Sequence, residues 1–433
     1  MLEHGALNLE CLGQVKSDAE QLRRVGKGRV DRDLGHCQIS MDLLASGMSD
    51  ANSPSLIPNS NGRLMSLDAF RGFVMFWIVG GEALAHALAK LDGVQSEVLN
   101  TVMIQLKHVS WEGFRFYDLI FPSFVFIVGA SVAFSLGKLQ ASGSRRDAVR
   151  RVIWRGLLLW LVGIIYYGGI SNGLYDAETN QGVRLLGVLQ RIGICYLVTG
   201  LLFIYLPVRG LVAAFLVLLG GYWALLSFVA VPGQEAVSFE EGRNITNWFD
   251  SKYLPFRKWS GTHDPEGILS TLPAIATCLL GVFAGLLLKN EGLTRGKKVL
   301  TLFGAGAIFV LVGNLWGGYH PVIKCLWTSS FVVLAGGWSL ILLAFFYLMI
   351  DVVHLKKWAM PFVWIGMNPI TIYLLSSVVE FTDIAERFLG GSVAEWANEI
   401  VPGLGALVVA MGGMFLIFWL CRTLYKRNVF FRI

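Results

Sequence analysis

The sequence predicts an all-α, polytopic membrane protein built as one transmembrane helical bundle. Of its 433 residues, 55% are hydrophobic and 15% are charged, whereas soluble domains carry about 25% charged residues. The mean hydropathy is +0.59, and several apolar runs approach the length of about 20 residues that crosses a bilayer. The net charge of +6 does not indicate nucleic-acid binding, because membrane proteins concentrate Lys and Arg in cytoplasmic loops.

The first 62 residues differ in composition from the rest of the chain. They are polar, mix both charges and end in the linker-like SDANSPSLIPNSNG, without the apolar core of a signal peptide. Residues 1–62 are therefore predicted to be a disordered cytoplasmic tail, or to lie upstream of a true start at Met48 or Met65. The transmembrane domain is predicted over residues 63–433.

The apolar runs predict about ten spans. In order they are 67–90, 116–137, 152–170, 185–206, 210–231, 266–288, 298–314, 327–350, 361–380 and 401–424, with a short external helix in 382–400. The tail and every second loop hold 23 Lys and Arg residues, against 10 in the other loops. Positive charge marks the cytoplasmic side, so both termini are predicted to be cytoplasmic, and loops 91–115 and 232–265 external.

The first span, SLDAFRGFVMFWIVGGEALAHAL, holds two polar pairs. Asp68 and Arg71 are three residues apart and can pair on one helix face. Glu82 and His86 are four apart near the external end, where the carboxylate could orient the imidazole. Ionisable groups inside a bilayer are costly and are functional candidates by default. Glu82 and His86 are therefore predicted to bind substrate or acetyl-CoA, although such pairs also serve as packing contacts.

The second span follows a polar loop in the stretch HVSWEGFRFYDLIFPSFVFIVG. A single loop histidine is usually a surface residue, but His108 is followed here by Trp111 and Asp118, which could wall and orient its ring. Imidazole is the commonest general base at neutral pH. His108 and Asp118 are therefore predicted as catalytic residues, and Trp111 as a substrate contact.

The fourth span contains the stretch RLLGVLQRIGICY. Arg191, which follows Gln190, lies too deep in this span to be only an interfacial anchor. A buried guanidinium needs a carboxylate or a bound anion. Asp118 and Glu82 are the expected partners if the role is structural, and otherwise Gln190 and Arg191 are predicted to bind substrate.

The sixth span is preceded by THDPEGILSTLPAIA. Pro265 is expected at the first helical position, with Asp264 as N-cap and Glu266 in the first turn. Capping alone would explain these residues. His263, Asp264 and Glu266 are also predicted to face the compartment of His108, where a carboxylate beside a histidine could deprotonate an amine or hydroxyl.

The eighth and ninth spans begin with unusual polar residues. CLWTSSFVV places Trp327 and Ser329 at the external start of one, and IGMNPITIYLLS places Asn368 before Pro369 inside the other. Proline removes a backbone hydrogen bond, so a kink is expected there. The six cysteines form no CxxC or Cys/His spacing, and no metal site is predicted.

The chain resembles the heparan-α-glucosaminide N-acetyltransferase family of membrane-embedded acyltransferases over nearly all of residues 63–433. The matching stretches are SLDAFRG, HVSWEGFRFYDLIFPSFVFIVGAS, GVLQRIGICY, HDPEGILSTL, LWTSSFV, GMNPITIY and FFRI. The GGEALAHALAKL form is typical of bacterial members. The lysosomal branch has a polar amide near Glu82 and no obvious counterpart of His86, and this departure leaves the acceptor open.

The resemblance implies transfer of acetyl from cytoplasmic acetyl-CoA to the amine of a terminal hexosamine on the periplasmic or external side of the inner membrane. It implies that His108 is the base or acetyl carrier and that Arg191, Trp327, Ser329 and Asn368 line the acetyl-CoA tunnel. A homodimer would fit the family. The alternative is a sugar or amino-sugar transporter, in which Arg191, Glu82 and Asp118 form the substrate path. A structural scaffold agrees less well with so many intramembrane charges.

Overall fold

Helices make up most of the described chain. The computed structural model describes residues 64–91, 97–141, 143–171, 173–176 and 178–430, so the predicted tail 1–62 lies outside the described residues. The helices up to residue 253 are α3 (Met65–Phe76), a π-helix (Trp77–Gly81), α4 (Glu82–Ala89), α5 (Glu97–Gln105), a 3-10 turn (Phe116–Leu119), α6 (Ile120–Ala141), α7 (Arg145–Tyr166), α8 (Val188–Tyr205), α9 (Val208–Phe228) and α10 (Ile245–Tyr253).

The second part of the chain continues the all-α pattern. It contains α11 (Thr271–Lys289), α12 (Arg295–Gly317), α13 (Ser329–Tyr347), a π-helix (Leu348–Val352), a 3-10 turn (Lys357–Ala359), α14 (Met360–Met367), α15 (Pro369–Val378), α16 (Phe381–Leu389), α17 (Ser392–Ile400) and α18 (Leu404–Lys426). The described strands, β1 (Tyr175–Asp176) and β2 (Gln181–Gly182), form a two-residue antiparallel hairpin between α7 and α8.

The polytopic helical membrane fold is confirmed. Among the described residues, eight helical stretches are long and apolar enough to cross a bilayer, and α14 with α15 forms a ninth if the bent pair is one span. The pair bends by 71°, as expected at Pro369. The remaining predicted span, 152–170, corresponds to α7, which has 22 residues but carries Arg150, Arg151 and Arg155 along its first turns.

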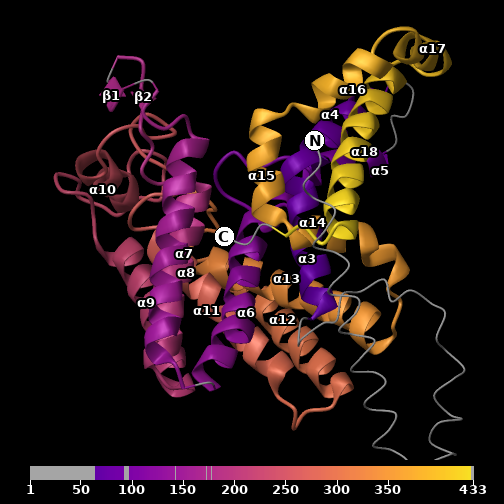
Figure 1. Ribbon diagram of the computed structural model, residues 1–433. Helices are drawn as coiled ribbons and strands as arrows, with labels where there is room; N and C mark the ends of the chain where they lie inside the picture. The colour runs from indigo at the N-terminus through magenta and orange to yellow at the C-terminus, as the bar shows by residue number, and fades with distance from the viewer. Residues whose placement is uncertain (1–63, 92–96, 142, 172, 177, 431–433) are drawn as a thin grey trace, which may run out of the picture. The chain divides into compact units, whose positions relative to one another are not determined.

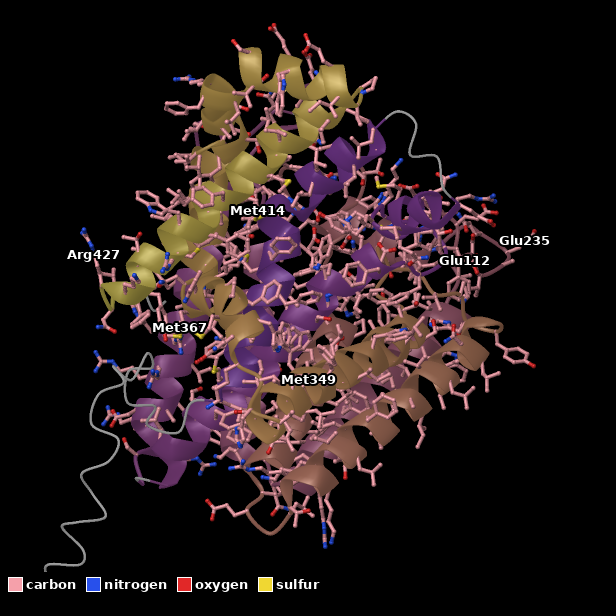
Figure 2. All side chains as sticks on the ribbon, turned by 90° about the vertical axis from the view of Figure 1, so that its right-hand side faces the viewer. Glu112, Glu235, Met349, Met367, Met414 and Arg427 are labelled. Atoms are coloured by element: carbon pink, nitrogen blue, oxygen red, sulfur yellow. The ribbon has the colours of Figure 1, made fainter. Side chains whose placement is uncertain are left out.

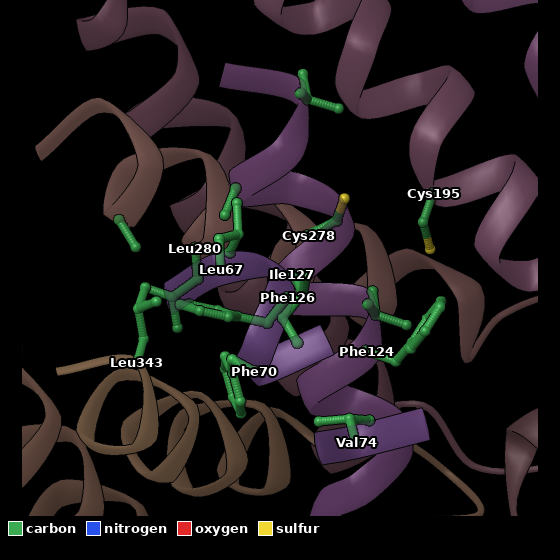
Figure 3. Packing of buried hydrophobic residues seen from close by; sticks show 14 of the residues in the cluster. Leu67, Phe70, Val74, Phe124, Phe126, Ile127, Cys195, Cys278, Leu280 and Leu343 are labelled. Carbon is green, nitrogen blue, oxygen red and sulfur yellow. The ribbon is translucent and has the colours of Figure 1, made fainter. Parts of the chain in front are cut away.

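The core lies where α3, α6, α8, α11 and α13 meet. Figure 3 shows buried side chains from these helices packed together, with Phe70 and Val74 beside Phe126 and Ile127. Cys195 and Cys278 are buried here and carry no disulfide, so they pack as small core residues. The helices that carry the polar site are thus held by a continuous apolar core.

Two helix crossings in this core depend on glycine. Gly129 of α6 and Gly281 of α11 face each other's helix so closely that a Cβ on either would overlap a carbonyl oxygen of the partner. Gly72 of α3 and Gly366 of α14 meet in the same way. Small residues let transmembrane helices approach closely and gain van der Waals contact. These crossings fix α6 and α3, which lead to the polar loops described below.

The connections between spans gather at opposite ends of the bundle (Figure 1). The turns joining α6 to α7, α8 to α9 and α11 to α12 lie at the lower end, whereas α10, the β1–β2 hairpin and α16–α17 lie towards the upper end. Glu112 lies towards the same end as Glu235 (Figure 2). The alternation matches the two loop sets predicted from charge, and the side of the membrane that each faces stays a prediction.

One predicted helix start is wrong. The sixth span was expected to begin at Pro265 with Asp264 as N-cap, but α11 begins at Thr271 after Ser270. The segment before it is a turn-rich loop in which Asp264 accepts the N–H of Glu266 at 3.0 Å. The carboxylate of Asp264 is held by Arg184, so it organises the loop instead of capping the helix.

Candidate active site

The loop between α5 and α6 holds the imidazole of His108 against the carboxylate of Asp118. His108 Nδ1 and Asp118 Oδ1 are 2.7 Å apart, and Asp118 Oδ2 accepts the backbone N–H groups of Val109 and Arg115. Asp118 is buried, whereas about half of the His108 side chain is exposed. Because the carboxylate accepts at Nδ1, that nitrogen carries the proton and Nε2 keeps its lone pair.

Lys324, in the loop before α13, joins this pair. Its Nζ lies 3.0 Å from Nδ1 and 3.3 Å from Nε2 of His108, and 3.5 Å from Asp118 Oδ1. Lys324 is a single lysine 216 residues from His108 and belongs to no motif with it, so the sequence did not predict its place in the site. Its position two residues before LWTSSFV was the only available signal.

Backbone contacts hold the two loops together. Gly113 has φ +123°, a conformation that favours glycine, and its N–H donates to the Val322 carbonyl at 2.8 Å. Glu112 and Ile323 form an antiparallel bridge beside it. Trp111 donates from Nε1 to the Phe239 carbonyl at 2.8 Å. Trp111 therefore fastens the loop before α10 to the loop that carries His108.

Arg184 gathers the carboxylates predicted in the HDPEG stretch. Its guanidinium binds both oxygens of Asp264, at 2.9 and 2.6 Å, and Oε2 of Glu266 at 2.7 Å. Its guanidinium lies over the rings of Tyr167, at 4.5 Å, and Trp259, at 5.0 Å. Burial alone would lower the pKa of Arg184, but the bond to Asp264 and the charge of Glu266 raise it above its ordinary value.

These contacts place Asp264 and Glu266 against Arg184 and leave Asp118 as the carboxylate on the His108 ring. Asp264 is 1% exposed and also accepts the Trp259 N–H at 3.0 Å, so its oxygens are occupied. Burial raises the pKa of Glu266, against the charges of Arg191 and Arg184. The catalytic roles proposed for Asp264 and Glu266 stay predictions, and the geometry favours a structural role for Asp264.

Arg191 is fully buried on α8, but its partners differ from those expected. Its Nη2 donates to Ser270 Oγ, and its guanidinium lies over the Trp327 ring at 4.9 Å. Among the described residues, Nε and Nη1 have no hydrogen-bond partner. The expected pairing with Asp118 or Glu82 is therefore wrong. A buried guanidinium with two unused donors is an anion or carbonyl site.

The ring of Trp327 packs against the guanidinium of Arg191. Trp327 has φ +53°, which is uncommon for a bulky residue, and its N–H closes a turn onto the Lys324 carbonyl at 2.9 Å. Its indole Nε1 donates to Thr277 Oγ1 at 3.1 Å. One tight turn thus presents Lys324 to His108 and Trp327 to Arg191.

His263 and Gln190 contact residues of the loops described above. His263 is buried, with Nε2 3.5 Å from Oε1 of Glu241 and its ring 6.4 Å edge-on from Trp111. Burial lowers the pKa of His263 in spite of the charges of Glu241 and Asp264. Gln190 donates to the Arg184 carbonyl at 3.1 Å, and its buried Oε1 has no partner among the described residues.

The other predicted substrate residues lie apart from His108. Ser329 donates to the Leu219 carbonyl at 2.8 Å, and Asn368 donates to the Val429 carbonyl at 3.0 Å. Both side chains are buried. Glu82 and His86 are exposed on α4, although the charge of Glu82 reaches Tyr117, whose ring lies 4.7 Å from His108.

A cavity of about 330 Å³ opens on the opposite side of the core. Its lining includes six polar side chains: Asp68, Arg71, Ser131, Ser135, Arg155 and Tyr196. Arg71 donates to Asp68 at 2.9 Å, which confirms the predicted pair, and to Ser131 at 2.6 Å. The cavity thus combines apolar walls with charged groups.

A second, much smaller apolar void lies beside this cavity. It measures about 10 Å³, shares the lining residues Phe124, Ile192 and Ile370 with the cavity, and is also lined by Phe121. The Phe121 ring packs edge-on against Trp327 at 5.3 Å. One wall of this void is thus in contact with the ring over which Arg191 lies.

The described residues include no group of three or more His, Cys, Asp or Glu side chains arranged to hold a metal ion. They offer instead a half-exposed imidazole with a buried carboxylate, a neighbouring ammonium and a buried guanidinium. An imidazole oriented by a carboxylate can take a proton from an amine or hydroxyl, and buried donors can stabilise an oxyanion. The arrangement suits acyl transfer.

Comparison with known proteins agrees with this chemistry. A family model described as "Heparan-alpha-glucosaminide N-acetyltransferase, catalytic" matches residues 63–315. The chain is 28% identical over 415 residues to the heparan-alpha-glucosaminide N-acetyltransferase of Mus musculus, which covers 83% of this chain and 60% of the relative. Identity to the Homo sapiens protein of that name is 29% over 375 residues, or 73% and 53% of the two chains. The chain thus spans less than two thirds of these relatives.

Proposed function

Because the chain belongs to the heparan-alpha-glucosaminide N-acetyltransferase family, we propose that it transfers an acetyl group from acetyl-CoA to the amine of a hexosamine. The observation that carries the proposal is the hydrogen bond between His108 Nδ1 and the buried carboxylate of Asp118. It leaves Nε2 of a half-exposed ring available to an incoming amine. Both relatives named above are N-acetyltransferases.

In the proposed reaction, His108 Nε2 takes a proton from the sugar amine as the nitrogen attacks the thioester carbon. Asp118 stabilises the imidazolium that forms, as the carboxylate does in other imidazole-based sites. The C–N bond forms, the C–S bond breaks, and the sulfur of CoA is protonated by the imidazolium. Direct transfer from a ternary complex needs no acetylated histidine, although the geometry also permits one.

Arg191 is the proposed oxyanion donor. The N–H groups of its Nε and Nη1 are buried and have no partner among the described residues, and electrostatic stabilisation of a developing charge is strongest in such surroundings. The charges of Arg191 and Lys324 both act on the carboxyl group of Glu266. Lys324 in turn contacts the imidazole.

The cavity between α3, α6 and α8 is the proposed donor site. Arg71 and Arg155 could bind the phosphates of CoA, while the apolar walls at Phe124 and Ile192 would contact its acyl-carrying arm. Ligand pockets are usually concave and apolar with a few polar groups, and this lining has that character.

We further propose that the donor enters from the cytoplasm and that His108 faces the periplasm or exterior of the inner membrane. The support is the charge bias of the loops. The loop that carries His108 belongs to the set poor in Lys and Arg, whereas α7 begins with a basic segment.

The alternative is an amino-sugar transporter that uses the same cavity and polar loops. Detergent-solubilised protein separates the two, because transport needs two compartments and transfer does not. With glucosamine and acetyl-CoA, an enzyme releases free CoA thiol and forms N-acetylglucosamine. No release with any of a panel of hexosamines and their terminal oligosaccharides would contradict the proposed activity.

The role of His108 is tested by His108→Ala. Loss of a general base is expected to lower kcat by about 100-fold or more, while the melting temperature stays close to that of the wild type. His354→Asn is the matched control, since His354 is an exposed loop residue with φ +64° and Asn tolerates that backbone. Full activity of His108→Ala would remove His108 from the mechanism.

A further inference from the structure

We propose that the ε-amine of Lys324 is itself an acetyl acceptor, modified when acetyl-CoA is bound and no sugar is present. The inference rests on the proposed function. It goes beyond it by assigning a covalent modification site to a residue that the reaction itself does not require. The site is defined by the loop that precedes α13.

The amine of Lys324 lies beside the nitrogen that is proposed to take a proton from the sugar amine. Lys324 Nζ is 3.0 Å from Nδ1 and 3.3 Å from Nε2 of His108, and Nε2 is the nitrogen that keeps its lone pair because Nδ1 is bound to Asp118. A general base must lie within hydrogen-bond reach of the proton that it removes. A rotamer change of Lys324 would bring its amine onto the lone pair of Nε2, and a bound hexosamine must exclude the lysine from that position.

The backbone keeps Lys324 in this position. Ile323 is bridged to Glu112, and the Trp327 N–H closes the turn onto the Lys324 carbonyl. Since both ends of the turn are fixed, the lysine stem has little freedom beyond its own rotamers. The effective concentration of an amine held in this way exceeds that of a free substrate.

The surroundings also favour the neutral amine that attack requires. About a quarter of the Lys324 side chain is exposed. Burial lowers the pKa of Lys324 below its ordinary value, in spite of the charges of Asp118 and Glu266, which act to raise it. Reactive lysines commonly acquire nucleophilicity through such desolvation.

The step balances without a further reactant. The Lys324 ammonium loses one proton to His108 Nε2, which passes it to water. The neutral nitrogen attacks the thioester carbon, the C–N bond forms and the C–S bond breaks. The second proton, from the attacking nitrogen, goes through His108 to the sulfur of CoA. The products are an N-acetyl-lysine, free CoA and one proton.

The amide product would alter the site. Acetylation removes the positive charge beside Asp118 and adds bulk next to the ring of His108. Because an amide is not reversed under these conditions, preincubation with acetyl-CoA alone should cause a progressive loss of transferase activity that parallels the label. The sugar acceptor should protect against this loss by displacing Lys324.

The test uses the purified full chain, isotope-labelled acetyl-CoA and tandem mass spectrometry. Labelling is expected at Lys324 well above Lys107, an exposed lysine adjacent to His108 in sequence that reports chemical acetylation. His108→Ala is expected to cut labelling of Lys324 by about 100-fold and leave Lys107 unchanged. Glucosamine is expected to suppress labelling of Lys324 only.

Lys324→Arg supplies a second measurement, because it keeps the positive charge without a nucleophilic amine. It is expected to resist inactivation by acetyl-CoA, whatever its starting activity. Equal labelling of Lys324 and Lys107, or labelling that survives His108→Ala, would overturn the inference. Acetyl transfer to sugar with Lys324 unlabelled would overturn it and leave the proposed function standing, whereas absence of any transfer would remove both.

Discussion

At the scale of single residues, the sequence predicted functional groups best where they lie close together along the chain. His108 and Asp118 are ten residues apart, and their contact follows from the loop that joins α5 to α6. Lys324 is 216 residues away, and nothing in its spacing relates it to His108. Asp264 shows the opposite error, since a good N-cap pattern concealed a buried ion pair with Arg184. Local patterns predict local contacts, and partners across the bundle need the fold.

Asp250 is a buried residue that the sequence did not single out. It lies on α10 with 0% exposure, and its Oδ1 accepts the Ile268 N–H at 2.9 Å, while Oδ2 has no partner among the described residues. Burial raises its pKa to about 6, although the hydrogen bonds from Ile268 and Asp264 oppose the shift. The carboxylate at neutral pH is therefore a cost to the folded state.

The pH dependence follows from that shift. Because the folded protein binds this proton more tightly than the unfolded chain, the contribution of Asp250 to stability is full below about pH 4 and is lost as the pH rises to about 6. Asp250→Asn keeps an acceptor for Ile268 and removes the charge. It is expected to raise stability at pH 8, by on the order of 3 kcal/mol at most, with little effect at pH 4.

Thermal unfolding in detergent across this pH range measures the effect. The exposed loop residue Glu291 supplies the control variant Glu291→Gln, which should leave the pH profile of the melting temperature unchanged. A melting temperature for Asp250→Asn that falls further below that of the wild type at pH 8 than at pH 4 would show that the carboxylate is stabilising in its charged form.

At the scale of elements, the apolar runs predicted the spans well because bilayer thickness fixes their length. The kink at Pro369 was also predictable, since proline cannot donate a hydrogen bond. The start of α11 was not, because the HDPEG stretch fits an N-cap and an ion-paired loop equally well. Only the position of Arg184, 80 residues earlier, decides between them.

The crossing of α6 and α11 depends on a glycine in each helix, and this makes a prediction about stability. Gly281→Ala would force a Cβ onto the Phe126 carbonyl, so the helices must separate. Overpacking of this kind costs about 1–3 kcal/mol. Gly220→Ala on α9 is the matched control, because open space surrounds Gly220 and Ala is the better helix former.

The reactivity of the buried thiols reports this separation. Cys278 lies at the crossing, so a thiol-reactive dye in a temperature ramp should detect Gly281→Ala opening several degrees below the wild type. The melting temperature of Gly220→Ala should be unchanged or slightly raised. Equal melting of all three proteins would mean that the crossing can relax without cost.

At the scale of the whole bundle, the sequence predicts more than the separate helices. Loops rich in Lys and Arg alternate along the sequence with loops that are poor in them. The structure places the two sets at opposite ends of the described helices (Figure 1). Both features arise from the same cause, because each span reverses the side on which the next loop emerges.

The side of the membrane that each loop faces can be measured by introducing one cysteine at a time. The background lacks Cys11, Cys37 and Cys325 and keeps the three buried cysteines. Glu112→Cys and Arg146→Cys replace exposed residues in the loop of His108 and at the start of α7. If the charge bias sets the orientation, a membrane-impermeant maleimide should label the first variant in intact cells with a permeable outer envelope. The second should react only after the inner membrane is opened. Labelling in the reverse order would place His108 in the cytoplasm, where the acceptor sugar and the donor would have to share one compartment.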